Sequence, residues 1–352
     1  MTAAAHPVRL EDHRTGTGGT MRAVRWNGPG DVTAVDVARP SAADGWALVD
    51  VAFTGLCGTD LHICAGDHPR AAPGLVLGHE ISGVLAHDVP GIAAGTAVVV
   101  DPLLSCGECG PCTSGRPHTC ARLRLVGIDV PGGAAEQVAV PVGGLVPVGV
   151  PGGPGAAGSD ADLAALAFAE PLGVAVRAVR RSGLVIGEDA VVVGAGPVGL
   201  AVALCARLAG AGSVTVVETS ERRRGFAAGL GLDVVGSLDG VQAPVVFDCA
   251  SHPAVAARLC EATAATGRIV LVGVYPGVTG LDLQAVTFKE LQVIGTRVYS
   301  RDDLRTATRM IVDGRFDPTP LLTRTVSVEE APAAIAALHG GHDVKVLVRG
   351  RG

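Results

Sequence analysis

The chain has 352 residues, of which 48% are hydrophobic and 18% charged, and its formal net charge is −6 at pH 7. This length favours two domains, and the composition excludes a disordered chain. Because the net charge is negative, the chain offers no strongly positive surface that would attract nucleic acid. Apolar runs such as 269–274 are far shorter than the roughly 20 residues that span a bilayer. We therefore expect a globular protein whose partners include neither nucleic acid nor a membrane.

The first twenty residues have no apolar central stretch, so they do not resemble a secretory signal. Their Gly/Thr-rich end predicts a flexible tail over residues 1–20, with the packed structure beginning at Met21. We expect a cytoplasmic location.

From Met21 to about Val150, short β-rich runs alternate with Gly, Pro and Asp turns, which predicts a β-rich domain. A Gly/Pro stretch at 151–159 leads into a helical spacing, and from Gly187 strands alternate with helices. That alternation predicts a doubly wound parallel sheet, so the fold class is α/β. We expect the C-terminal part to return to the first domain, giving domains at 21–165 with 301–352 and at 166–300.

Four cysteines lie close together in DPLLSCGECGPCTSGRPHTC, namely Cys106, Cys109, Cys112 and Cys120. Four thiolates at such short spacing can surround one tetrahedral zinc. A disulfide framework suits a secreted chain better, and iron–sulfur clusters use other spacings. The sequence predicts a structural zinc lobe at about 104–122, with no position open for a substrate.

A glycine-rich loop follows the apolar run AVVV and opens a helix. Gly194, Gly196 and Gly199 give the G-x-G-x-x-G pattern, with Pro197 and Val198 starting the helix. Loop amides and a helix N-terminus can hold a pyrophosphate. In this context the pattern predicts a dinucleotide-binding site.

Glu218 ends the next strand, where a carboxylate accepts hydrogen bonds from ribose hydroxyls and repels a 2′-phosphate. This favours NAD over NADP. Ser220 and the arginines 222–224 are residue types that bind a 2′-phosphate, although they could equally be an exposed helix face. Arg223 and Val274 complete the predicted coenzyme contacts, and Asp248 lies either near the coenzyme or in a turn cap.

A second metal site is indicated by GLCGTDLHICAG and LGHEISG, which contain Cys57, His79 and Glu80. A thiolate, an imidazole and a carboxylate suit zinc, and three protein ligands leave a position for an alcohol. Singly, each has a plainer explanation as a small core residue, a loop histidine or a surface charge.

Taken together, CGTDLH, GHE, the four-cysteine lobe, EPLGVAV, GAGPVG and KELQVIGTRVY resemble the zinc-containing medium-chain dehydrogenases in order and spacing, from about Met21 to Val348. The resemblance implies a GroES-like catalytic domain with an inserted Rossmann domain, two zinc ions and NAD. It also implies a homodimer or homotetramer. Cys57, His79 and either Glu80 or Glu170 would hold the catalytic zinc, with water completing the site.

The resemblance further implies hydride transfer between a secondary alcohol and NAD. Thr59 and His62 would relay the departing proton to water, with Glu80 beside the reacting centre. Thr59 has a second interpretation, as the cap of a helix starting near Asp60.

The substrate is the least defined feature. Glu170 and the polar pair Arg297 and Tyr299 suggest a polyol, a diol, a sugar-derived alcohol or a 2-amino-3-hydroxy acid. Arg297 and Tyr299 could instead stabilise a strand end. L-threonine 3-dehydrogenase and an NADP-linked ketone reductase are the alternatives, and a non-catalytic NAD-binding module belongs to a competing class that usually lacks the Cys/His/acid set.

Overall fold

The computed structural model of the protein describes residues 14–149, 158–338 and 341–351. The chain divides into two compact units, the first formed by residues 1–170 and 307–352 and the second by 171–306. These boundaries lie within six residues of those expected at 165/166 and 300/301. The chain passes between the units within helix α4 (Ala169–Ser182) and helix α9 (Arg301–Val312).

The first unit is built on a largely antiparallel sheet with strand order β10-β6-β5-β3-β18-β17, to which β9 adds by pairing with β3. A second sheet has the order β2-β1-β4, and β7 pairs with β8. The strands are β1 (Arg14–Gly28), β2 (Asp31–Ser41), β3 (Trp46–Gly55), β4 (Leu75–Val76), β5 (Glu80–Leu85), β6 (Ala97–Val100), β7 (Leu103–Leu104), β8 (Arg124–Leu125), β9 (Gln137–Pro141), β10 (Leu145–Pro147), β17 (Leu322–Ser327) and β18 (Lys345–Arg349).

Alternating side chains explain why these segments form strands. Along β3 the burial alternates, and Val49 and Val51 join Ile81, Val98 and Val138 in one fully buried core cluster. β-branched residues suit such a pleated, half-buried surface. The sheet joins distant parts of the sequence, because β18 pairs with β3 near residue 55.

The helices of the first unit are short and serve mainly to connect strands. They are α1 (Gly58–Ala65), α2 (Gly110–Thr113), α3 (Asp160–Ala167) and α10 (Ala331–Leu338), together with 3₁₀ turns at Pro117–Thr119, Val142–Gly144 and Thr319–Leu321. Ser159 caps α3 by accepting a hydrogen bond from the amide of Asp162 at 3.2 Å.

The predicted tail needs a correction. Residues 14–20 belong to β1, where Thr15 pairs with Pro40 and Thr20 with Ala38. Cross-strand hydrogen bonds therefore order a segment whose composition predicted flexibility. The rest of the predicted tail, residues 1–13, lies outside the described residues, as do 150–157 of the Gly/Pro stretch.

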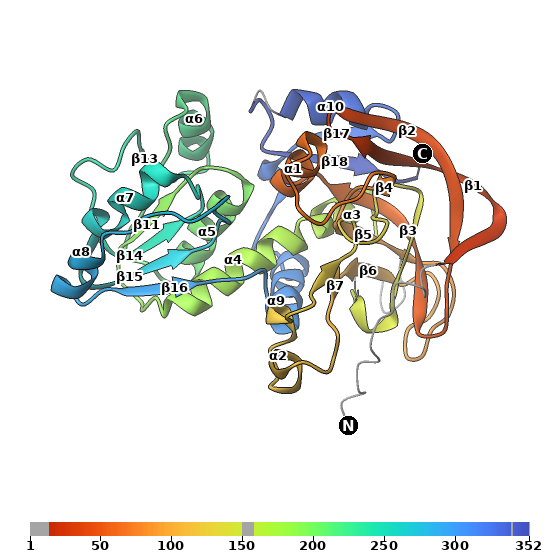
Figure 1. Ribbon diagram of the computed structural model, residues 1–352, viewed down its shortest axis with the longest axis horizontal. Coiled ribbons are helices and arrows are strands. Elements are labelled where there is room, and N and C mark those ends of the chain that lie inside the picture. Colours follow the sequence, from red (N-terminus) through yellow and green to blue (C-terminus); the bar gives the residue numbers. More distant parts are fainter. Residues whose placement is uncertain (1–13, 150–157, 339–340, 352) are drawn as a thin grey trace. The chain divides into compact units, whose positions relative to one another are not determined.

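The second unit contains the parallel sheet that the alternating pattern predicted. Its strand order is β13-β12-β11-β14-β15-β16, and every neighbouring pair is parallel. Figure 1 shows β11, β14, β15 and β16 as adjacent arrows. The strands are β11 (Ala190–Val193), β12 (Val214–Val217), β13 (Asp233–Val235), β14 (Ala243–Asp248), β15 (Thr263–Leu271) and β16 (Gln292–Gly295).

Helices α5 (Pro197–Leu208), α6 (Glu221–Gly229), α7 (Pro253–Ala262) and α8 (Leu283–Phe288) connect these strands. From β11 the chain moves outward through α5 to β12, and it later crosses to β14 on the other side of β11. Right-handed crossovers in opposite directions place their helices on opposite faces of the sheet. The carboxyl edge between β11 and β14 is the topological switch point, where such sheets bind ligands.

Within the described residues, no helix combines the length and the apolar character that crossing a bilayer requires.

Candidate active site

The end of β3 leads directly into the first candidate metal ligand. Cys57 is the N-cap of α1, with φ −118° and ψ 161°. Its amide donates to Oδ2 of Asp60 at 2.9 Å, which fixes the first turn of the helix. Because the helix begins at Gly58, the interpretation of Thr59 as the helix cap is wrong.

Glu80 is the first residue of β5 and His79 directly precedes it, and both are buried. Among the described residues, His79 Nδ1 makes no hydrogen bond, although Asp60 Oδ1 lies 3.8 Å away. Burial lowers the pKa of His79, but Asp60 and Cys57 together raise it well above its usual value. The imidazole therefore faces a negative environment, which favours a cation.

Ligand atoms of Cys57, His79 and Glu80 all lie within 4.8 Å of one another. A sulfur, a ring nitrogen and a carboxylate oxygen are the donors that zinc accepts, and three of them leave a position for a further ligand. Glu170, in the first turn of α4, is also buried and lies close enough to raise the pKa of His79. The chemistry of this donor set fits a zinc ion.

Lys345 is a member of this site that the sequence prediction missed. Its Nζ donates to both carboxylate oxygens of Glu80, at 2.7 and 2.8 Å, and to the carbonyl of Leu56 at 2.9 Å. The residue is 1% exposed. Burial lowers the pKa of Lys345, but Glu80 and Cys57 raise it above its usual value. An available signal was that the chain has only two lysines and that this one follows Val344 in an apolar final strand.

Gly55 makes room for the same carboxylate. A Cβ at this position would lie 1.9 Å from Glu80 Oε2, so no other residue fits beside Glu80 in this arrangement. The backbone of β3 and the ammonium group of Lys345 thus hold the carboxylate from two directions.

The predicted relay residues lie on α1. Thr59 Oγ1 is 3.8 Å from Cys57 Sγ. His62 follows three residues later, so both side chains share one face of the helix. His62 is exposed.

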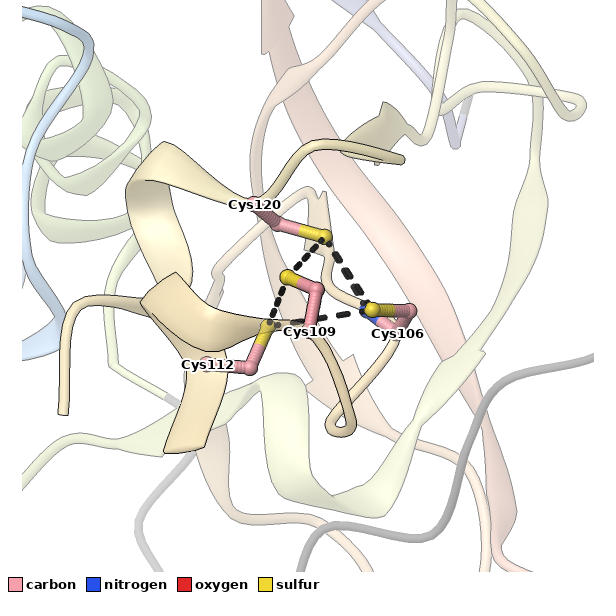
Figure 2. Close-up of side chains that lie close together, drawn as sticks. All are labelled: Cys106, Cys109, Cys112 and Cys120. Atoms are coloured by element: carbon pink, nitrogen blue, oxygen red, sulfur yellow. Dashed lines mark hydrogen bonds between the residues drawn. The ribbon is translucent and has the colours of Figure 1, made fainter. Parts of the chain in front are cut away.

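The four cysteines of the lobe converge (Figure 2). Their sulfur–sulfur distances include 3.4 Å between Cys106 and Cys120, 3.5 Å between Cys109 and Cys112, 3.7 Å between Cys109 and Cys120 and 3.9 Å between Cys106 and Cys112. A tetrahedron with zinc–sulfur bonds of about 2.3 Å has edges of about 3.8 Å. All nine cysteines are free, so no disulfide competes with this arrangement.

Backbone amides favour charged sulfur in this lobe. The amides of Glu108 and Cys109 lower the pKa of Cys106 to about 6. The amides of Ala121 and Cys112 likewise lower the pKa of Cys109. Burial raises the pKa of Cys112, so these amides favour the thiolate form at Cys106 and Cys109 only. The four convergent sulfurs fit a structural zinc.

The glycine-rich loop joins β11 to α5, with Gly196 as N-cap and Pro197 and Val198 in the first turn. Gly194 has φ +101°, a conformation that favours glycine. A Cβ at Gly199 would lie 2.0 Å from the carbonyl of Gly194, whereas a Cβ at Gly196 would meet nothing within 4 Å. The loop is thus tightly packed on one side and open where a pyrophosphate would approach.

Glu218 follows β12 and turns toward this loop. Its Oε2 accepts from the amide of Ala195 at 3.0 Å, and its Oε1 accepts from the amide of Ser220 at 2.8 Å and from Arg223 Nη2 at 3.1 Å. Burial raises the pKa of Glu218, but these donors bring it below its usual value. The carboxylate is ionised and well held.

The arginines near Glu218 differ from one another. Arg224 Nη1 donates to the carbonyls of Glu218 and Thr219, at 2.9 and 2.7 Å, while Arg222 is exposed. Ser220 caps α6. Two of the three arginines are therefore tied to the chain around Glu218, and the exposed-face interpretation describes Arg222 alone.

The remaining predicted residues differ in how exposed they are. Val274 is 90% exposed, and Arg297 is exposed as well. Tyr299 is fully buried, with its ring 3.2 Å from where a Cβ of Gly173 would stand. This packing favours the structural interpretation of Tyr299. Asp248 caps a turn by accepting from the amides of Ala250 and Ser251, both at 3.1 Å.

The chain is similar to known proteins over most of its length. Residues 43–150 match the alcohol dehydrogenase GroES-like domain, and residues 197–313 match the zinc-binding dehydrogenase family. The 2-dehydro-3-deoxy-L-galactonate 5-dehydrogenase of Pseudoalteromonas atlantica is 36% identical over 324 residues, which cover 86% of this chain and 91% of that protein. The L-threonine 3-dehydrogenase of Streptomyces coelicolor is 31% identical over 348 residues, covering 92% and 98%.

A solved structure of an Escherichia coli alcohol dehydrogenase complexed with NADH superimposes with a TM-score of 0.84 at 25% identity, covering 94% of this chain and 100% of that chain. The chain belongs to the zinc-binding alcohol dehydrogenases of the medium-chain type. It is an oxidoreductase that acts on the CH–OH group of secondary alcohols with zinc and a nicotinamide coenzyme. The predicted family and the predicted pairing of a GroES-like with a Rossmann domain are confirmed.

Proposed function

We propose that the protein oxidises a secondary alcohol of a sugar-derived acid with NAD. The observation that carries this proposal is the buried group of Cys57, His79 and Glu80, whose ligand atoms lie within 4.8 Å of one another. The substrate class is supported by the galactonate-type relative at 36% identity. L-threonine is the second candidate substrate, supported by the threonine 3-dehydrogenase at 31% identity.

Cys57, His79 and one carboxylate would hold the catalytic zinc. Glu80 is the favoured carboxylate because its oxygen lies within the 4.8 Å group, and Glu170 is the alternative. Zinc bound there would supply the Lewis acidity that lowers the pKa of a hydroxyl group. Lys345 compensates the charge of Glu80 and orients its two oxygens.

The residues on α1 would move the proton. Thr59 carries a hydroxyl that can accept and donate at once, and it lies beside the Cys57 sulfur. His62, three residues later and exposed to solvent, would pass the proton on to water. Thr59→Val should therefore lower kcat more than Thr59→Ser, because only the latter keeps the hydroxyl.

Glu218 would select NAD over NADP. Its pKa lies below the usual value, so the carboxylate is charged at neutral pH and repels a 2′-phosphate. Arg223 lies against that carboxylate and would also contact the adenosine ribose.

The edge strand β16 supports association with a second copy. Among the described residues, β15 is its single partner strand. Val293 within β16 is 42% exposed, and Phe288 at the end of α8 is 78% exposed. Unpaired strand edges with apolar side chains favour pairing with another chain. We propose a homodimer formed through this edge, or a homotetramer built from it. A reducing compartment such as the cytoplasm suits a chain with nine free cysteines.

A substrate panel with two metal-site variants tests the proposal. Zinc-loaded protein is incubated with NAD or NADP and with sugar acids, polyols, butanediols, threonine and simple alcohols, and reduced coenzyme is measured. We expect NAD-dependent turnover of sugar acids that Cys57→Ala abolishes while one zinc per chain remains. Cys205→Ala, which changes a buried cysteine on α5, is the matched control. Equal turnover of simple primary alcohols would contradict the substrate class.

Zinc analysis of Glu80→Gln and Glu170→Gln then identifies the carboxylate ligand. If Glu80 is the ligand, only its variant loses the second zinc. Retention of both ions by Glu80→Gln would assign the role to Glu170.

A further inference from the structure

Two loops of the second unit meet at the carboxyl edge of its sheet. One follows Asp248, the last residue of β14, and contains Ser251, and the other follows β15 and contains Gly273 to Tyr275. A Cβ at Gly273 would lie 2.5 Å from Ser251 Oγ, so the loops touch directly.

Asp248 joins these loops through both its backbone and its side chain. Its carbonyl accepts from the amides of Val272 and Gly273, at 2.9 and 3.0 Å. One carboxylate oxygen holds its own turn through the amides of Ala250 and Ser251. The other accepts the hydroxyl of Tyr275 at 2.6 Å.

Tyr275 is a neutral donor in this bond. Burial raises the pKa of its hydroxyl, and the hydrogen bond to Asp248 raises it further. Asp248 is 0% exposed, so the bond ends on a carboxylate shielded from water. Hydrogen bonds to charged groups are the stronger ones in proteins.

The same loop presents an apolar side chain to the outside. Val274, next to Tyr275, is 90% exposed, although apolar residues of a loop gain nothing from water. Along the carboxyl edge, Glu218 after β12 offers a ribose-binding carboxylate and the Gly194–Gly199 loop after β11 offers the pyrophosphate site. A dinucleotide that crosses the switch point must continue over β14 and β15. The nicotinamide half therefore arrives where Val274 is exposed.

We propose that Tyr275 is a positioning residue for the coenzyme: its hydrogen bond to Asp248 fixes the loop after β15 so that Val274 packs against the nicotinamide ring. This proposal rests on the proposed NAD-dependent function and adds a residue that contacts no reacting atom. It predicts that loss of the Tyr275 hydroxyl weakens the binding of the nicotinamide half of the coenzyme and leaves the binding of the ADP-ribose half unchanged.

Calorimetric titration of the full chain with NADH and with ADP-ribose, which lacks the nicotinamide, separates the two halves. In Tyr275→Phe we expect the Kd for NADH to rise by roughly fivefold, as loss of one hydrogen bond to a charged group implies, with the Kd for ADP-ribose unchanged. Thr279→Val is the matched control, because it removes a hydroxyl from the same loop that donates to the nearby carbonyl of Gly277 and not to Asp248. It should leave both Kd values unchanged.

Asp248→Asn provides a rescue test. Its amide oxygen can still accept from Ala250 and Ser251, and its NH₂ group can donate to the Tyr275 oxygen, so the ratio of the two Kd values should stay near that of the wild type. Equal weakening of NADH and ADP-ribose in Tyr275→Phe, or no weakening of either, would overturn the proposal. So would a loss in Asp248→Asn as large as that in Tyr275→Phe.

Failure of the proposed function gives a different result, because the wild-type protein would then bind neither ligand. If the wild type binds both ligands equally well, coenzyme binding stands and the role of Tyr275 is contradicted.

Discussion

Lys345 and Glu80 form a deeply buried ion pair of the first unit, with the two side chains 2% and 1% exposed. The attraction between buried charges offsets their desolvation only while both partners are present. Since 265 positions separate them in the sequence, the pair also ties the last strand to β5.

Lys345→Met should therefore destabilise the protein by about 3 kcal/mol, the cost of leaving one buried charge without its partner. Denaturant unfolding measures this loss. The double variant with Glu80→Gln should recover part of the stability, because it removes the orphaned charge, although it also removes a candidate zinc ligand. Equal destabilisation by the single and double variants would show that the ammonium group acts through packing alone.

The two glycines of the coenzyme loop differ in function as well as in packing. A Cβ at Gly199 would strike the Gly194 carbonyl, whereas one at Gly196 would enter open space. Gly199→Ala should thus lower the melting temperature, while Gly196→Ala should leave it unchanged and weaken NADH binding by tenfold or more, since the backbone must approach the pyrophosphate there. Thermal unfolding and NADH titration of both variants test this. Unchanged NADH binding in Gly196→Ala would place the pyrophosphate elsewhere.

At the scale of elements, several hydrogen bonds converge on the Asp303 carboxylate at the start of helix α9. The Ser300 amide and hydroxyl both donate to Asp303, and Arg180 donates to the same carboxylate at 2.6 Å. Burial raises the pKa of Asp303, but Ser300 and Arg180 lower it below its usual value. A depressed pKa in the folded state contributes stability that is present above the unfolded pKa of about 4 and is lost as the pH falls through the folded value.

Asp303→Asn should cost on the order of 2 kcal/mol at pH 7, because a charged acceptor of several hydrogen bonds is lost. The difference in unfolding free energy between Asp303→Asn and the wild type should shrink as the pH falls below about 4. Urea unfolding at a series of pH values measures this trend. The neighbouring Asp302→Asn, at an exposed position whose ion pair to Arg305 spans 3.9 Å, is the control and should show little change at any pH. A difference for Asp303→Asn that is independent of pH would rule out the charge as its source.

How far the sequence predicts an element depends on how local its cause is. Strand β11 and helix α5 were predictable because periodicity, glycines and a proline at the first helical position all lie within about twenty residues. Strand β13, only Asp233–Val235 and not fully buried, gives no such pattern and forms because β12 lies beside it. The same holds for residues 14–20, which pair with β2 against their loop-like composition.

The candidate site shows the same division. Cysteine spacing predicted the four-sulfur lobe, because its ligands fall within fifteen residues. The Lys345–Glu80 pair and the Tyr275–Asp248 bond connect residues far apart in the sequence, and no local pattern indicates them. Tyr299 is buried and Arg297 is exposed, so the two residues that the sequence suggested as a polar pair lie in different environments.

At the scale of the whole molecule, the proposed dimer through β16 can be tested with a single substitution. Val293→Asp places a charge on the exposed face of this edge strand and should dissociate the proposed dimer, because an interface core tolerates unpaired charge poorly. Analytical ultracentrifugation would then detect the single chain. Ile186→Asp, at a residue that is 86% exposed, is the control and should not alter the mass of the assembly in solution. An unchanged assembly in Val293→Asp would move the interface away from β16.

The central claim is that this chain transfers a hydride from the carbinol carbon of a secondary alcohol to a nicotinamide coenzyme. The most direct measurement follows deuterium from a substrate labelled at that carbon, with NMR of the reduced coenzyme. We expect one deuterium at C4 of the nicotinamide ring per molecule of alcohol oxidised and none from deuterated solvent. Reduced coenzyme without the label, or with deuterium taken from the solvent, would contradict direct hydride transfer and with it the assigned chemistry.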